Sequence, residues 1–141
     1  MQSKMLFLRP IPLSRLTSAI GDKAQKNTQG YGGRPYGVGL IVAGVDETGP
    51  HIHECSPSGN VYDYHAVSIG ARCQSAKTYL EKYYTEFPEA SLQDLIVHGL
   101  RAIAETLQTD KNLTTANVSV GWVGAGAGES FHLVEDEDLT P

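Results

Sequence analysis

The chain has 141 residues, 40% of them hydrophobic and 19% charged, with a formal net charge of −5. This length and composition predict a single globular domain that covers residues 1–141. The acidic balance and the scattered lysines and arginines argue against nucleic-acid binding, and no apolar run approaches the ~20 residues that a membrane-spanning helix needs.

The first predicted element is a helix over residues 13–27. Residues 1–10 are expected to be irregular, and Ser14 is the candidate amino-terminal cap. Four apolar residues recur at helical spacing on one face: Leu13, Leu16, Ile20 and Ala24. A corner rich in glycine and proline follows, and it cannot continue the helix.

A series of short strands is predicted after this corner. The first, over residues 38–45, has apolar residues on both faces, which indicates a buried strand. Turn residues then separate it from three further extended segments. These segments cover residues 51–55, 61–65 and 66–70.

Two helices and a final hairpin are predicted in the second half of the chain. One helix has Ala76, Tyr79, Leu80 and Tyr83 along a single stripe. The pattern Ser91-x-x-Asp94 opens the other helix with a capping box. Strands over 118–123 and 131–134 flank a glycine turn, and the acidic segment 135–141 is expected to form a tail.

The order of these elements predicts an α+β fold. Helix, four strands, two helices and two strands follow one another, and most strand connections are as short as a turn. Short connections favour antiparallel pairing, so the sheets should be largely antiparallel.

Few residues offer a metal or cofactor site. Cys55 and Cys73 lack metal-ligand spacing and are expected to be reduced thiols. His51 and His53 share a strand face, but neither His65 nor Glu54 supplies a matching third ligand. A solvated strand face and no metal site are therefore expected.

Catalytic and phosphate-binding signatures give no better candidate. The run Gly124–Gly128 resembles a phosphate loop, but a strand-like segment follows it where a helix would be needed. We therefore interpret this glycine run as a hairpin turn. No serine lies in a nucleophile elbow, so we expect no catalytic residue and no cofactor.

Three segments carry a resemblance to a known family. They are Asp22–Gln29, the corner Arg34-Pro-Tyr-Gly-Val-Gly-Leu40, and Ile69–Glu81 with its Ala-Lys-Thr-Tyr-Leu-Glu sequence. Together they resemble 20S proteasome alpha-type subunits, and within that family the alpha type-1 branch. The resemblance extends over residues 11–134, with a long amino-terminal part of the family, including its gating segment, missing.

This resemblance implies a four-layer α-β-β-α sandwich, the architecture of amino-terminal-nucleophile hydrolases, of which the chain would be the carboxy-terminal half. It implies a non-catalytic structural subunit in a seven-membered alpha ring that stacks on a beta ring and supports ubiquitin-dependent protein degradation. The partners would be the other alpha subunits and the beta-ring subunits, in the cytoplasm and nucleus. A half-sandwich should be poorly soluble alone.

The residues expected to matter act by packing at the corner and around the helix after it. They are Arg34, Pro35, Tyr36, Gly37, Gly39, Gly70, Arg72, Tyr79 and Leu80. Two alternatives stay open from the sequence. One is a threonine peptidase of the same fold, with Thr17 or Thr28 as nucleophile, and the other is an unrelated small α/β binding module with its ligand near Gly124–Gly128.

Overall fold

The computed structural model describes residues 11–108, 111–124 and 130–135. The chain divides into two compact units, Met1–Val67 and Ser68–Pro141, which we call the helix–sheet unit and the helix-pair unit. The single domain inferred from the sequence stays a prediction. The irregular start, the glycine turn and nearly all of the acidic tail lie outside the described residues.

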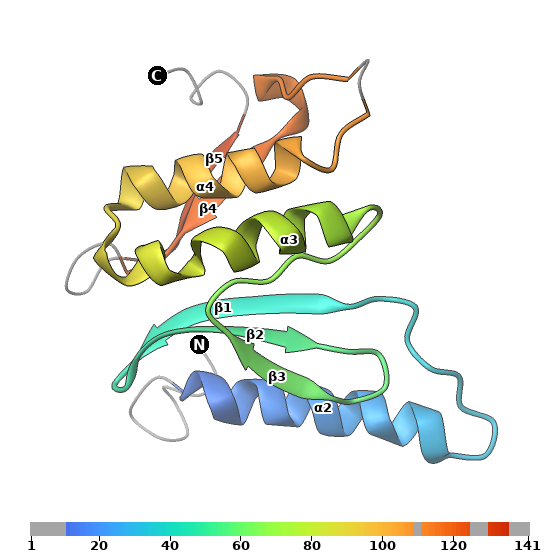
Figure 1. Cartoon of the computed structure of the whole chain (residues 1–141). Helices are drawn as coiled ribbons and strands as arrows, with labels where there is room; N and C mark the ends of the chain where they lie inside the picture. The colour runs from blue at the N-terminus through green and yellow to red at the C-terminus, as the bar shows by residue number, and fades with distance from the viewer. Residues whose placement is uncertain (1–10, 109–110, 125–129, 136–141) are drawn as a thin grey trace. The chain divides into compact units, whose positions relative to one another are not determined.

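The helix–sheet unit is one helix packed on a three-stranded antiparallel sheet (Figure 1). Helix α2 spans Leu13–Gln29, close to the predicted bounds. Strands β1 (Leu40–Asp46), β2 (Gly49–Cys55) and β3 (Val61–Tyr64) follow in that order across the sheet. Both pairings are antiparallel, as the short turns predict.

One face of this sheet packs against α2. The helix buries Leu13, Thr17, Gly21 and Ala24, which recur at the spacing of one helix face. Gly44 of β1 gives Leu13 room, because a Cβ at Gly44 would lie 3.1 Å from the Leu13 Cδ1 atom. Close approach of helix and sheet therefore depends on small residues on both sides.

The opposite face of the sheet, which we call the far face, is apolar and largely open. Strand alternation and the register place on it Ile41, Ala43, Val45, Ile52, Tyr62 and Tyr64. Ile41 is 42% exposed and Val45 is 48% exposed. The prediction that this strand is buried is therefore wrong for its far-face residues, which are exposed.

Two further expectations for this unit are wrong. Residues 66–70 form no strand. Ser14 does not cap α2, since the cap residue is Pro12 and no side chain there accepts a cap hydrogen bond. Instead, the Leu13 backbone N–H donates to the Asp46 Oδ2 atom of β1 at 3.2 Å. A tertiary contact thus satisfies a donor that a local cap was expected to take.

The helix-pair unit contains α3 (Cys73–Tyr83) and α4 (Leu92–Ala104), which pack on each other. Two short 3₁₀ segments are Tyr84–Glu89 and Thr115–Asn117. The capping box of Ser91 and Asp94 is confirmed, with both reciprocal hydrogen bonds present. Strands β4 (Ser119–Trp122) and β5 (His132–Glu135) form the predicted antiparallel hairpin.

The predicted α+β class with antiparallel sheets is confirmed. Every strand pair in the described residues is antiparallel. Among those residues, no helix combines the length and apolar character that crossing a membrane requires.

Candidate functional site

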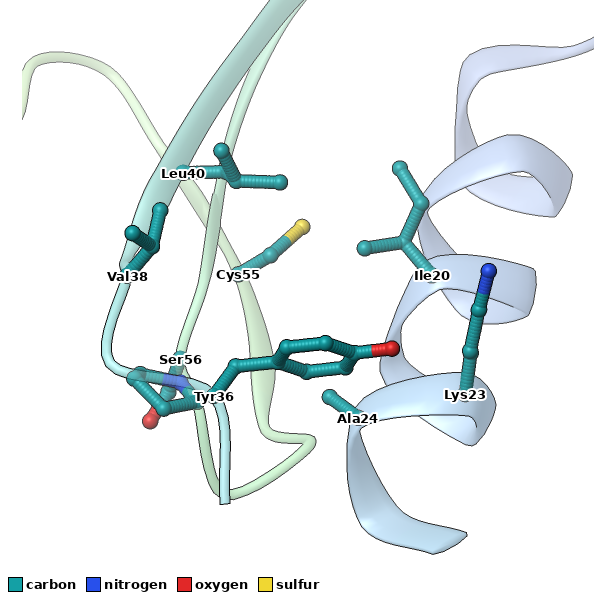
Figure 2. Close-up of a pocket in the computed structure, with 9 residues that line it drawn as sticks. Ile20, Lys23, Ala24, Tyr36, Val38, Leu40, Cys55 and Ser56 are labelled. Atoms are coloured by element: carbon teal, nitrogen blue, oxygen red, sulfur yellow. The ribbon is translucent and has the colours of Figure 1, made fainter. Parts of the chain in front are cut away.

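The corner after α2 closes over a small apolar cavity of about 260 Å³ between the helix and the sheet. Figure 2 shows the ring of Tyr36 reaching from the corner toward α2, with Cys55 on the strand side. The lining residues are Ile20, Lys23, Ala24, Tyr36, Val38, Leu40, Cys55, Ser56 and Pro57. Tyr36 thus lines this cavity although it is 43% exposed, and its predicted packing role stays a prediction.

Cys55 has the character of a packing residue at this cavity. Its side chain is buried, and burial raises the pKa of its thiol because the thiolate loses its hydration. A thiol with a raised pKa is a poor nucleophile. The chemistry available here is therefore the burial of apolar groups.

The other predicted corner residues are exposed. Arg34, Pro35, Gly37 and Gly39 all lie at the surface of the run that joins α2 to β1. A Cβ at Gly37 would meet no atom within 4 Å. Their packing role stays a prediction.

The remaining four predicted residues lie around α3 in the helix-pair unit. Arg72, at φ 56°, precedes α3, and its Nε atom donates to the Thr106 carbonyl at 2.6 Å. Gly70, at φ 109°, sits in the region that favours glycine. The Tyr79 hydroxyl lies 3.0 Å from the His98 Nδ1 atom of α4, and Leu80 is half-buried.

In the helix–sheet unit, a polar cluster that the sequence did not predict lies on the side of the sheet that faces α2. His53 is only 7% exposed, and its Nδ1 atom lies 2.7 Å from the Thr17 hydroxyl. The solvated face expected for this histidine is therefore wrong. Antiparallel pairing of β2 and β3 sets Asp63 opposite His53.

Asp63 lies close to both His51 and His53, the two histidines that share a strand face. Its Oδ2 atom is 3.4 Å from His51 Nδ1, and its Oδ1 atom is 3.7 Å from His53 Nε2. Asp63, and neither His65 nor Glu54, is the third residue of this cluster. The signal was available in the hairpin, because the register across the 56–60 turn pairs position 53 with position 63.

Thr17 is a packing residue and not a nucleophile. It is 1% exposed, and its hydroxyl lies 3.0 Å from the Leu13 carbonyl and 2.7 Å from the His53 ring. A buried, helix-bonded hydroxyl cannot supply the exposed amino-terminal threonine that a peptidase of this fold requires. Thr28, at the end of the same helix, bonds only its own turn.

Replacing Thr17 by valine should lower the free energy of unfolding by about 1–3 kcal/mol, because a buried His53 nitrogen loses its partner. Chemical denaturation followed by circular dichroism measures this change. Thr28→Val is the matched control and should change the value by less than about 0.5 kcal/mol. Equal losses in the two variants would contradict the buried role of Thr17.

The lowered pKa of Asp46 predicts that acid destabilises the helix–sheet unit. The Thr48 hydroxyl and backbone N–H, then the Leu13 N–H and nearby His51, lower the pKa of Asp46 from 3.8 to about 2. A lowered pKa contributes stability that is fully present above pH 3.8 and is lost as the pH falls toward 2.

Urea unfolding at a series of pH values should show this loss between pH 4 and 2 in the wild type, and a weaker loss in Asp46→Asn. Asp94 of the other unit also has a lowered pKa, caused by Ser91, so only the difference between the two proteins reports on Asp46. Parallel pH curves would contradict the assignment.

Comparison with known proteins places this fold in a family. The family model described as "Proteasome subunit" matches residues 1–123. The chain belongs to the proteasome subunit family. The match reaches residue 1 and ends at Val123, whereas the resemblance was expected over residues 11–134.

The related proteins are alpha-type subunits. Proteasome subunit alpha type-1 of Dictyostelium discoideum is 53% identical over 130 residues, which are 92% of this chain and 52% of that protein. A probable alpha type-6 subunit of Schizosaccharomyces pombe is 49% identical over 98% of this chain and 50% of its own length. The alpha type-6 subunit of Saccharomyces cerevisiae is 46% identical over 86% and 53%.

The chain therefore spans about half the length of the curated relatives it matches. These similarities bear out the resemblance to the alpha type-1 branch. They also overturn the alternative of an unrelated small α/β binding module.

Proposed function

We propose that this chain is a non-catalytic structural subunit of the alpha ring of the 20S proteasome core, supporting ubiquitin-dependent protein degradation. The observation that carries the proposal is its 53% identity over 92% of its length to a proteasome subunit alpha type-1. Its partners would be the other alpha subunits of a seven-membered ring and the beta-ring subunits. It would act in the cytoplasm and nucleus.

The exposed apolar surface supports a role in assembly. Soluble monomers rarely expose large contiguous apolar patches, and such patches usually mark interfaces. The far face carries Ile41, Val45 and two tyrosines that are at least 40% exposed. We propose that this face packs against a second sheet, as in a four-layer α-β-β-α sandwich.

The threonines support a structural role as well. Thr17 is committed to the contact between α2 and His53, and Thr28 to its own helix end. Neither arrangement activates a hydroxyl for attack on a peptide bond.

The test is affinity purification of the tagged full chain from cells that also express the remaining core subunits. We expect peptidase activity to co-purify with the chain, and to be unchanged per particle by Thr28→Ala. Peptidase activity per particle that falls with this exposed substitution would show the chain to be catalytic. Absence of any other core subunit from the eluate would overturn the structural role.

A further inference from the structure

We propose that His51, His53 and Asp63 form a binding site for a divalent transition-metal ion of the Zn²⁺ class on the α2 side of the sheet. Each residue presents one ligand atom, and the three atoms lie within 4.8 Å of one another. Imidazole nitrogen and carboxylate oxygen are ligands that such ions prefer. The site is independent of the proposed function in assembly.

The spacing of the ligand atoms suits such an ion. Tetrahedral zinc with bonds of about 2.0–2.1 Å separates its ligand atoms by about 3.3 Å. Asp63 Oδ2 lies 3.4 Å from His51 Nδ1 and Asp63 Oδ1 lies 3.7 Å from His53 Nε2, and one ligand atom from each residue lies within 4.8 Å of the others. Only small side-chain movements would be needed to close the site around one ion.

Hydrogen bonds fix the tautomer of His53. The Thr17 hydroxyl has a single proton, and two helix carbonyls, those of Leu13 and Ser14, lie 3.0 and 3.1 Å from its oxygen. When the hydroxyl donates this proton to one of the two carbonyls, the Thr17 oxygen accepts a hydrogen bond from His53 Nδ1–H at 2.7 Å. The Nε2 atom of His53 then turns its lone pair toward Asp63.

The same argument holds for His51. Its Nε2 atom lies 2.5 Å from the Thr48 hydroxyl, which itself donates to Asp46 Oδ1. Nε2 therefore carries the proton, and Asp46 stands 3.4 Å from it. A carboxylate behind the non-ligating nitrogen is the usual partner of a metal-bound histidine, and the lone pair on Nδ1 faces Asp63.

With these tautomers, three acceptor groups converge among the described residues. Two imidazole lone pairs face one carboxylate, an arrangement that a bound cation, whether a metal ion or a proton, would stabilise. The Asp63 side chain is 58% exposed and that of His51 is 26% exposed, so an ion can reach the site from solvent. The buried His53 anchors the site to the helix through Thr17.

The test is a Co²⁺ titration of the full chain after treatment with a chelator, followed by visible absorption, with Zn²⁺ competition. We expect one saturable site with nitrogen and oxygen ligands, and a higher midpoint of thermal unfolding with Zn²⁺. Asp63→Asn and His51→Asn should each weaken binding at least ~10-fold.

Two matched variants serve as controls. Glu54→Gln removes a carboxylate from the opposite face of the same sheet, and His65→Asn removes a histidine outside the cluster; both should bind as the wild type does. Asp63 is largely exposed, so its replacement by asparagine should keep the fold, which circular dichroism checks. No saturable binding, or binding that Asp63→Asn leaves unchanged, would overturn the site.

Discussion

Replacing Gly59 by alanine is expected to destabilise the helix–sheet unit strongly. Gly59 has φ 94°, a region that alanine enters at a cost of about 1–2 kcal/mol. The new Cβ would also lie 2.8 Å from Gln25 Cβ and 2.9 Å from the Gly21 carbonyl oxygen. Overpacking of this kind costs about a further 1–3 kcal/mol, measurable by urea unfolding.

Gly49→Ala is the matched control for this prediction. Gly49 lies in the same unit at φ 113°, but its Cβ would meet nothing within 4 Å. It should show the backbone cost of about 1–2 kcal/mol alone. Equal losses in the two variants would show that α2 does not press on the turn at Gly59.

Placing lysine at both Ile41 and Val45 is expected to weaken assembly of the chain with its partners at least ~10-fold. These side chains lie on the far face and are 42% and 48% exposed, so the isolated unit should lose little stability. In an interface, each lysine would lose its hydration without gaining a partner. Co-purification with core subunits should fall at least ~10-fold, which needs only about 1.4 kcal/mol.

The isolated wild-type chain should self-associate through the same face, and the double variant should do so less. Analytical ultracentrifugation of the purified chains measures this directly. Ser18→Lys adds a charge on the exposed side of α2 and is the matched control. A wild-type chain that stays a monodisperse monomer at high concentration would contradict the role of the far face.

Local patterns predicted most of the secondary structure. The spacing of Leu13 and Ala24 placed α2, and Ser91-x-x-Asp94 placed the start of α4, because these signals depend on residues a few positions apart. The expectation of a strand over residues 66–70 failed, because no neighbouring strand in the described structure pairs with it.

Contacts between residues that are distant in the sequence could not be predicted from such local patterns. Nothing local shows that Thr17 would face His53, or that Asp46 would take the Leu13 N–H in place of a cap at Ser14. Asp63 joins the cluster only through the register of β2 and β3. The corner motif, by contrast, indicated the family although most of its residues make no buried contact.

The most direct test of the proposed function is native mass spectrometry after co-expression of the chain with the remaining alpha-type subunits. We predict a hetero-oligomer that contains one copy of this 15.2 kDa chain together with different alpha subunits. Recovery of the chain only as free protein or as a homo-oligomer, while the other subunits assemble without it, would contradict the proposal.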